Sequence, residues 1–558
     1  MKAITQRGIF LFILLIPSLL LLPSLAQAYT ETFYVSARGT CTSSCKSSGN
    51  PGSVAYFNSS SNWARTVSND GKIGPDDVVY LMDDGGAYTS QLTVQASGTS
   101  GNVITIMPAP GDNVEFRPTS NTAFSTGGQD YITLDCNDNI TLYADTSITA
   151  DHSIINAAYS EYITINGCTV DGSTNVTATG GARAINIGSS GGNNYTITNN
   201  TISYTTLGIV WFAKSGAGDD TFTKVGTISG NTIHHMNLRP PGGDCGGCDC
   251  INMASSQFEA NADYSGVIIE NNHVSQCWDD GIDVFTTIGT TVRYNEVGPI
   301  TDDTKNTVTA IKIGIGGSDW GRDIKVYGNY VHDILDPDND NYGINTNGGG
   351  GGSEIYSNIV ENVGTVGIRI GNQAGSPGET LVYNNTVICK KGNLNGIGLD
   401  NNDEYDIYIR NNIVAGPCSD NAINVGGTNS ANVYGGYNIM SDYASVNNGS
   451  GTYIGAANDL GSTDPLLNAD YTLSSSSPAI DAGLNLGAPF NKALLPGSVW
   501  PNDVIVVDPY MDGTQREIGA YVYIDNAESV NGEGIIVSVK KDEIVIRSGP
   551  STATMLSD

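Results

Sequence analysis

The sequence predicts an all-β protein built as a parallel β-helix, a solenoid in which every coil of the chain adds short strands to stacked parallel sheets. The first observation is a repeat, because eight segments share a short alternating strand, an asparagine, one further residue and an aliphatic residue. The asparagines recur at spacings of 23 to 41 residues, most of them near 30, which is typical of a solenoid. The second observation is period-two alternation rich in β-branched residues and punctuated by glycine and asparagine, which favours strands over helices.

The chain starts with a basic segment, MKAITQR, and an apolar run that ends in Ala-Gln-Ala at 26–28. This pattern is typical of a secretory signal over 1–28, so we expect a secreted protein whose mature chain begins near Tyr29. An uncleaved anchor is the alternative, but Pro17, Pro23 and the small-residue cleavage site favour a signal. No later stretch is apolar and long enough for a membrane span.

The rest of the chain is too long for one ordinary globular domain, but a solenoid has no such limit because each unit contacts only its neighbours. The sequence has 57 acidic and 25 basic residues and a formal net charge of −32. That balance argues against nucleic-acid binding, which needs basic surface, and it permits binding of divalent cations. We expect the protein to act as a monomer.

Four regions follow the signal. Residues 29–125 contain several short strands and are expected to cap the solenoid and form its first coils. Residues 126–460 carry the repeats and the candidate active-site face. Residues 461–521 break the period and are expected to close the far end, and residues 522–558 are expected to form a tail or a small hairpin.

Ten cysteines in an exported chain favour disulfide bonds. Two pairs fall at similar places in successive repeats and are expected to bridge adjacent coils: Cys136 with Cys168, and Cys389 with Cys418. A further cluster has a pairing that the sequence leaves open: Cys245, Cys248, Cys250 and Cys277. A zinc site made of these four thiolates is the less favoured alternative.

The repeated asparagines are expected to form a ladder at one turn, each amide bonding to the next coil. They are Asn200, Asn231, Asn272, Asn295, Asn329, Asn358, Asn385 and Asn412. Glycosylation patterns also overlap the repeat, as in Asn199-Asn200-Thr201. The ladder is favoured because a buried stack excludes a glycan.

A second strand follows each asparagine turn and carries a core isoleucine. The expected inward column is Ile185, Ile209, Ile251, Ile282, Ile311, Ile344, Ile368, Ile397 and Ile423. The residue after each isoleucine must then point outward. That outward column is Asn186, Val210, Asn252, Asp283, Lys312, Asn345, Arg369, Gly398 and Asn424.

The stretch CWDDGIDVF (277–285) crowds Asp279, Asp280 and Asp283 into five positions, and Asp249 lies one coil earlier. Four carboxylates this close repel one another, so a nearby positive charge is needed to stabilise them. Carboxylate oxygens are the ligands that a hard cation such as Ca²⁺ prefers. The alternative is a polar turn in which the aspartates cap loop amides.

Lys312, in TAIKIGIGG, lies one coil above Asp283 in the outward column. A nearby cation lowers the pKa of a lysine, and a neutral lysine is a competent general base. The alternative is a structural ion pair between Lys312 and an aspartate of the coil below.

The segments CDCINM, CWDDGIDVF and TAIKIGIGG resemble the core of the family 9 polysaccharide lyases, which are right-handed parallel β-helix pectate lyases; NYGINTNGG (341–349) resembles the element that follows. The resemblance covers residues 245 to 349. It departs from the family at Ile282, where an aromatic residue is usual, and at Cys250, where glycine is usual. It implies that Asp249, Asp279, Asp280 and Asp283 bind Ca²⁺ and that Lys312 is the catalytic base.

The implied reaction is β-elimination on an acidic polysaccharide that contains uronate, such as pectate. Ca²⁺ would bind the uronate carboxylate, and Lys312 would take the C5 proton. Arg369 and Asn345 are expected to bind substrate, although Arg369 could instead pair with exposed acids. Trp278 and Tyr342 could stack on sugars, but packing is the simpler role for them.

The same residues allow two other functions. A glycoside hydrolase would use two carboxylates, such as Asp249 and Asp283, but would leave Lys312 without a role. A non-catalytic surface or glycan-binding β-helix with a structural calcium ion is the main alternative. The adjacent His234 and His235 are expected to point to opposite sides of a strand and so to make a poor metal pair.

Overall fold

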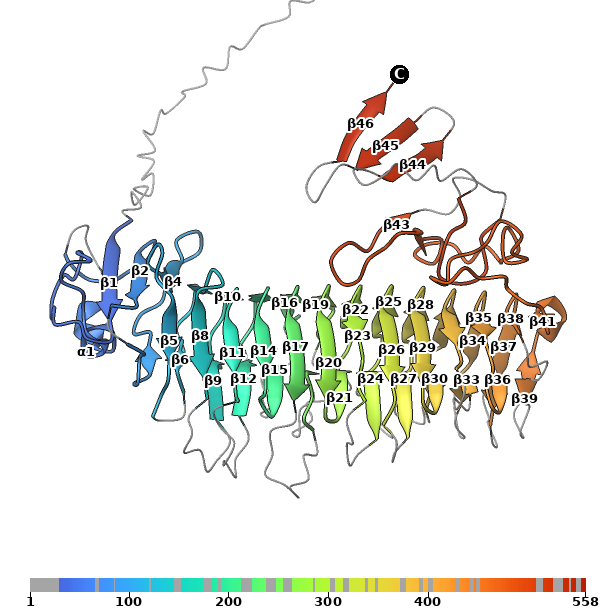
Figure 1. Ribbon diagram of the computed structural model, residues 1–558, viewed down its shortest axis with the longest axis horizontal. Coiled ribbons are helices and arrows are strands. Elements are labelled where there is room, and N and C mark those ends of the chain that lie inside the picture. Colours follow the sequence, from blue (N-terminus) through green and yellow to red (C-terminus); the bar gives the residue numbers. More distant parts are fainter. Residues whose placement is uncertain are drawn as a thin grey trace, which may run out of the picture.

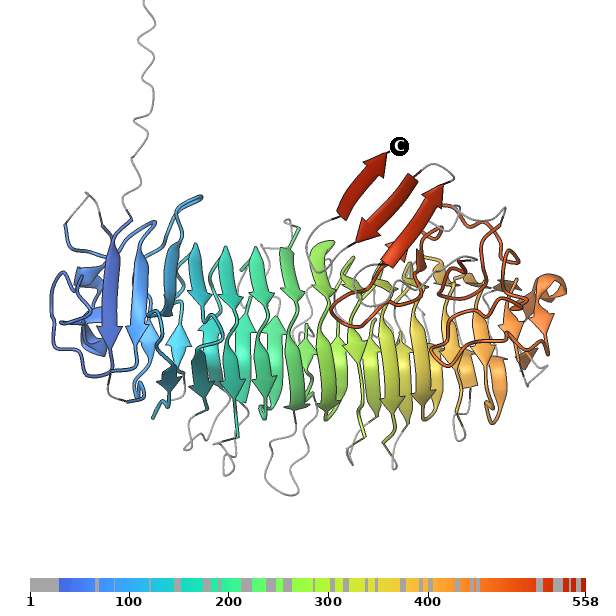
Figure 2. The ribbon, with the colours of Figure 1, turned by 45° about the horizontal axis from the view of Figure 1, so that its top comes forward.

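The computed structural model is an elongated solenoid built from three long parallel sheets (Figure 1, Figure 2). Each coil adds one strand to the first, then the second, then the third sheet, so strands one coil apart in the chain become hydrogen-bonded neighbours. The protein is therefore a right-handed parallel β-helix, as the sequence predicted.

The structure describes residues 30–557 apart from 66–69, 85, 120–121, 145–151, 174–181, 189–191, 212–222, 237–246, 254–262, 285–286, 302–306, 315–320, 337–339, 347–349, 372–377, 391–394, 400–404, 427–431, 442–445, 448–451, 508–514, 525–534, 541–542 and 548–552. The predicted signal peptide lies outside these residues. Within them, no helix is long and apolar enough to cross a membrane.

The first sheet contains β1 (Thr32–Ser36), β2 (Val78–Met82), β4 (Ile104–Pro108), β7 (Ile132–Asp135), β10 (Ile163–Asn166), β13 (Tyr195–Thr198), β16 (Val225–Ser229), β19 (Gly266–Glu270), β22 (Thr291–Arg293), β25 (Lys325–Tyr327), β28 (Glu354–Tyr356), β31 (Thr380–Tyr383), β34 (Ile407–Arg410), β37 (Val433–Gly436) and β40 (Tyr453–Ile454).

The second sheet contains β5 (Val114–Phe116), β8 (Ile140–Tyr143), β11 (Thr169–Asp171), β14 (Thr201–Ser203), β17 (Thr232–Met236), β20 (His273–Cys277), β23 (Glu296–Val297), β26 (Tyr330–Ile334), β29 (Ile359–Val363), β32 (Thr386–Ile388), β35 (Ile413–Ala415), β38 (Ile439–Met440) and β41 (Leu460–Gly461).

The third sheet contains β3 (Leu92–Thr93), β6 (Phe124–Ser125), β9 (His152–Ala157), β12 (Ala182–Ile187), β15 (Leu207–Trp211), β18 (Ile251–Asn252), β21 (Asp280–Asp283), β24 (Val308–Lys312), β27 (Asn341–Asn345), β30 (Val366–Ile370), β33 (Asn395–Leu399), β36 (Asn421–Val425) and β39 (Val446–Asn447).

The other elements are short. They are α1 (Val54–Phe57), the 3₁₀ helices η1 (Ser60–Asn62) and η2 (Ala456–Asn458), the antiparallel pair β42 (Ala493–Leu494) and β43 (Val506–Val507), and an antiparallel sheet of β44 (Ile535–Lys540), β45 (Glu543–Arg547) and β46 (Ala553–Ser557). The last sheet replaces the tail or small hairpin expected for 522–558.

The asparagine ladder is present between the first and second sheets. The side-chain oxygen of Asn231 accepts from both the backbone N–H and the side-chain amide of Asn200, at 3.0 and 2.9 Å. The same two bonds repeat from coil to coil through all eight predicted asparagines and on to Asn438, with Asp459 as the final acceptor. The ladder prediction is confirmed, and burial of the ladder satisfies amides that would otherwise cost free energy.

The two predicted cross-coil disulfides are present, and the central cluster pairs in part. Four bonds join described cysteines: Cys41–Cys45, Cys136–Cys168, Cys250–Cys277 and Cys389–Cys418. Cys248 is disulfide-bonded as well, whereas Cys245 lies outside the described residues. The zinc alternative is wrong, because disulfide sulfurs have no thiolate to offer a metal.

The corner between the second and third sheets has a recurrent backbone conformation. Five residues at equivalent places in the coils have positive φ: Tyr204, His235, Gln276, Asp333 and Asn362. The left-handed residue turns the chain, so its side chain does not point opposite to that of the residue before it. The expectation for His234 and His235 is therefore wrong, since their Nδ1 atoms lie 2.7 Å apart.

The segment after β41 does more than cover the end of the solenoid. It runs back along the turns between the first and second sheets, above coils that Figure 1 labels from β25 to β38. The indole N–H of Trp500 donates to the Gly328 carbonyl at 2.8 Å, and the amide of Asn384 donates to the Phe490 carbonyl at 3.1 Å. The expectation that 461–521 closes the far end is thus too narrow.

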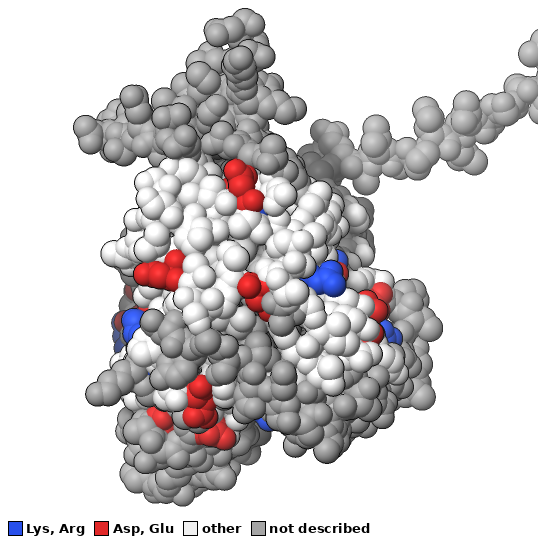
Figure 3. Space-filling view, turned by 90° about the vertical axis from the view of Figure 1, so that its right-hand side faces the viewer, with Lys and Arg blue, Asp and Glu red and all other residues white. Residues whose placement is uncertain are grey.

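Charged side chains are sparse on the end of the molecule that Figure 3 shows. In Figure 3 the described acidic side chains appear as separate groups among uncharged residues, with few basic ones. On this face the described acidic side chains do not form a single patch.

Candidate metal and catalytic site

The register of the third sheet brings the predicted site residues onto neighbouring coils. Ile251, Ile282, Ile311, Ile344 and Ile368 pair in order across five strands and are fully buried. The next residues pair in the same order: Asn252, Asp283, Lys312, Asn345 and Arg369. The register predicted from the repeat is therefore confirmed.

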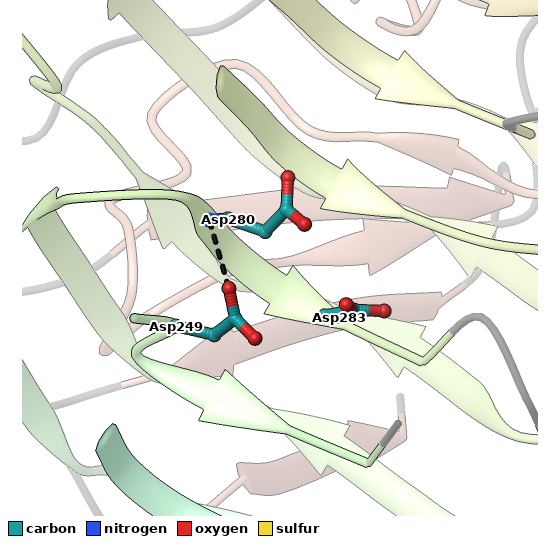
Figure 4. A group of neighbouring side chains, drawn as sticks. All are labelled: Asp249, Asp280 and Asp283. Carbon is teal, nitrogen blue, oxygen red and sulfur yellow. Dashed lines mark hydrogen bonds between the residues drawn. The ribbon is translucent and has the colours of Figure 1, made fainter. Parts of the chain in front are cut away.

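Three aspartates converge on the outer side of this sheet (Figure 4). Asp249 precedes β18, and Asp280 and Asp283 are the first and last residues of β21. One carboxylate oxygen from each lies within 4.8 Å of those of the other two. Their exposed fractions are 1 %, 1 % and 3 %, so all three charges are buried.

Backbone hydrogen bonds hold two of the carboxylates in place. Oδ1 of Asp249 accepts from the N–H of Asp280 at 3.0 Å, the dashed contact in Figure 4. Oδ1 of Asp280 accepts from the N–H of Thr309 at 3.1 Å on the following coil. The Asn252 amide also donates to Oδ2 of Asp249. In both cases a backbone N–H of one coil holds the aspartate carboxylate of the preceding coil.

Gly281 explains why two aspartates three residues apart point the same way. A Cβ added at Gly281 would lie 2.5 Å from the Ala310 carbonyl oxygen and 2.7 Å from Val297, a buried residue of β23. Gly281 and Ile282 therefore both face the interior, which breaks the alternation and leaves Asp280 and Asp283 outside.

The same position is small in every coil of the region. The residues are Ala184, Gly208, Cys250, Gly281, Ala310, Gly343, Gly367, Gly396 and Ala422. The strand pairing skips this position between β21 and its neighbours and again in later coils. This column of small residues was the sequence signal that could have revealed the break.

Lys312 completes the group. Its Nζ lies 2.6 Å from Oδ2 of Asp280 and 3.7 Å from Oδ2 of Asp283, and its side chain is 19 % exposed. Burial lowers the pKa of Lys312, but the charges of Asp280, Asp283 and then Asp249 raise it more, so the net shift is upward. Without a bound cation the side chain is an ammonium ion.

One ammonium does not balance three carboxylates. Burial raises the pKa of Asp249 well above its usual range, and the charges of Asp283 and Asp280 raise it further. Without a cation the negative charge of this group is therefore disfavoured, and its buried carboxylate oxygens are the kind of ligand that Ca²⁺ prefers. Asp249, Asp280 and Asp283 fit this ion.

Asp279 does not join the three acids. Its Oδ2 accepts from the N–H of Gly247 at 2.8 Å, and its side chain is half-buried. Burial, followed by the charges of Asp280 and Asp249, raises its pKa to about 8. The structure brings together three of the four aspartates singled out by the sequence.

The two residues expected to bind substrate lie beyond Lys312 in the same column. An Nη1–H of Arg369 donates weakly to Oδ1 of Asn345 at 3.4 Å. The guanidinium lies over the ring of Tyr342, 4.6 Å from the ring centre. The ring of Tyr342 therefore packs against the guanidinium of Arg369. Because Tyr342 is only 8 % exposed, it offers little surface on which a sugar could stack.

No family model and no curated protein matches the chain. Solved structures do match. A pectate lyase, Pel9A, has 13 % identity and a TM-score of 0.31, over 89 % of this chain and 98 % of that one. A mannuronic acid specific family 6 lyase from human gut microbiota has 14 % identity and a TM-score of 0.47, over 74 % and 87 %.

A lacto-N-biosidase from Eubacterium ramulus matches as well, with 13 % identity and a TM-score of 0.36, over 77 % of this chain and 67 % of that chain. At such identities and TM-scores these matches assign no activity to this chain.

Proposed function

We propose that the protein is a secreted, calcium-dependent polysaccharide lyase that cleaves a uronate-containing, pectate-like polysaccharide by β-elimination. The observation that carries this proposal is the contact between Lys312 and a buried group of three carboxylates on one outer face. The motifs that resemble the family 9 lyases contain these same four residues.

Asp249, Asp280 and Asp283 would hold the ion. When bound, Ca²⁺ supplies positive charge that binds the uronate carboxylate, acidifies C5 and neutralises the aspartates. The aspartates are the reason that the pKa of Lys312 is raised, whereas burial lowers it. Once the aspartate charges are neutralised, burial is the dominant effect on the pKa of Lys312 and lowers it. The amine is then neutral and can accept a proton.

Lys312 then removes the proton from C5 of the uronate. The C4–O bond breaks as the C4=C5 double bond forms, and the leaving oxygen takes a proton from water. The ammonium of Lys312 returns its proton to solvent before the next cycle. Ile311 in β24 and Ile313 directly after it are both buried, so the backbone on either side of Lys312 is held in place and the amine stays over the acids.

Arg369 and Asn345 would bind the sugars next to the cleaved bond. Arg369 lies two strands beyond Lys312, which is about 10 Å at the usual strand spacing. Its guanidinium is fixed by Tyr342 and Asn345, so it can bind a second uronate carboxylate with little loss of conformational freedom.

One observation favours a second function. The 2.6 Å contact between Lys312 and Asp280 is a satisfied ion pair, as expected for a structural lysine. A non-catalytic, glycan-binding β-helix with a structural calcium ion would keep the same contact.

The test is an assay of the purified protein with polygalacturonate and Ca²⁺, followed by the ultraviolet absorbance of the unsaturated product. We expect activity that EDTA removes and that Lys312→Ala abolishes. Lys325→Ala, which changes an exposed lysine of β25, is the control and should behave as wild type.

Two results would count against the proposal. Activity that survives Lys312→Ala would refute the mechanism while leaving a lyase possible. No activity on polygalacturonate, rhamnogalacturonan or alginate, together with measurable binding to one of them, would favour the non-catalytic role.

A further inference from the structure

We propose that His234 and His235 form a binding site for a divalent transition-metal ion that prefers nitrogen ligands, Zn²⁺ or Cu²⁺. The pair lies at the end of β17, in the second sheet, and is separate from the aspartates of the third sheet. Both imidazoles are half-buried, so an ion can reach them from solvent.

The backbone creates the pair. His235 has φ +59°, the left-handed conformation found at this corner in several coils, and it brings two consecutive side chains together. The equivalent pair three coils later shows the same geometry, with Nδ1 of His332 3.0 Å from Oδ2 of Asp333. At that corner the partners are a base and an acid, which satisfy each other. At His234 and His235 the partners are two identical rings.

The two nitrogens are placed as a chelate would need them. Their separation is 2.7 Å, and one Nδ1–H donates to the other when no ion is bound. Tetrahedral Zn²⁺ with bonds of about 2.0–2.1 Å places two ligand nitrogens about 3.3 Å apart. If the distance between the two Nδ1 atoms widens by about 0.6 Å, both nitrogens can bind the same ion. Water would then fill the remaining coordination positions of the metal.

The surroundings orient both histidine rings. The ring of Tyr204 stacks on His235 at 5.1 Å and meets the edge of His234 at 6.1 Å. Metals bind the neutral form of imidazole. Zn²⁺ and Cu²⁺ bind imidazole nitrogen more strongly than Ca²⁺, which prefers oxygen ligands.

The neighbouring strand adds a third histidine to the same face. His273 of β20 pairs with Thr232 of β17, and its Nδ1 lies 3.1 Å from Oε2 of Glu296. The ring of His273 is therefore held by a carboxylate, as is usual around metal sites, although His273 is not needed as a direct ligand.

The test uses the full-length mature protein and adds Zn²⁺ by calorimetry in excess Ca²⁺, so that the aspartates are occupied. A second measurement uses Cu²⁺ and records nitrogen couplings by electron paramagnetic resonance. The variants are His234→Gln and His235→Asn, because asparagine tolerates the positive φ at 235. His332→Ala is the control at the equivalent corner.

We expect wild type and His332→Ala to bind one more equivalent of Zn²⁺ than either variant, and to show Cu²⁺ coupled to two imidazole nitrogens. Circular dichroism should show that each variant is folded. Equal Zn²⁺ stoichiometry in wild type and both variants, or a Cu²⁺ signal unchanged by them, would overturn the proposal.

Discussion

Asp280 is the residue on which the candidate site depends most. Its Oδ1 accepts a backbone N–H from the next coil, its Oδ2 contacts Lys312, and its own N–H holds Asp249. Asp279, the adjacent residue, makes none of these contacts and accepts instead from Gly247. Two consecutive aspartates therefore have different roles, and this difference can be tested.

We predict that Asp280→Asn weakens Ca²⁺ binding by at least about tenfold, since it removes a charged ligand and disturbs the groups hydrogen-bonded to it. Calorimetric titration with Ca²⁺ gives the dissociation constants. Asp279→Asn is the matched control and should have a much smaller effect. Equal losses in both variants would mean that Asp279 is a ligand after all.

Residue-level prediction succeeded where a side chain follows from the repeat. Lys312 and Asp283 were placed correctly because each comes directly after a core isoleucine, and one period separates them. It did not separate Asp279 from the three converging aspartates, because simple alternation does not show that Gly281 and Ile282 both face inward. It also failed for His234 and His235, because a positive φ at a non-glycine residue leaves no mark in the sequence.

At the scale of elements, the turns are as important as the strands. The asparagine ladder fixes the stacking of every coil that carries the site, and it runs along the chain from Asn200 to Asn438. Its repeat was visible in the sequence because the same residue type must recur in every coil. The small-residue column of the third sheet recurs in the same way but mixes glycine, alanine and cysteine, which conceals it.

We predict that Asn329→Ala lowers the free energy of unfolding by about 3 kcal/mol, since the amides of Asn295 lose their acceptor and Asn358 loses a donor inside the protein. Urea unfolding measures this change. Asn432→Ala, an exposed position with one side-chain bond, is the control and should cost less than about 1 kcal/mol. Similar losses in both would argue against the ladder as a source of stability.

At the scale of the whole molecule, the segment after β41 was the least predictable part. Its contacts join residues more than a hundred positions apart, such as Ser357 with Lys492 and Thr386 with Ala520. Lys492 and Ala520 lie outside the repeats, so the period of the solenoid does not predict these contacts. The three sheets, by contrast, follow from local alternation and a single period, and they were predictable from the sequence.

Acid stability of the solenoid should depend on Glu296, which lies between His273 and His332. Burial raises the pKa of Glu296, but hydrogen bonds from the two histidines outweigh it and lower the pKa to about 2. Because the folded pKa lies below the unfolded one, this stabilisation is complete above the unfolded pKa and is lost as the pH falls towards about 2.

We therefore predict that Glu296→Gln flattens the decline of the melting temperature between pH 5 and pH 2, as recorded by calorimetry at several pH values. The exposed Glu379 provides the control, since Glu379→Gln should leave the slope as in wild type. A Glu296→Gln slope equal to that of wild type would show that this cluster contributes nothing to acid stability.

The central claim is that the solenoid places an amine over three acids that together hold a calcium ion. A crystal structure of the protein grown with Ca²⁺, with the ion located by its anomalous scattering, tests this most directly. We predict one ion bound to Asp249, Asp280 and Asp283, with Lys312 beside it. An ion bound elsewhere, or a side chain of Lys312 turned away from these acids, would contradict the account.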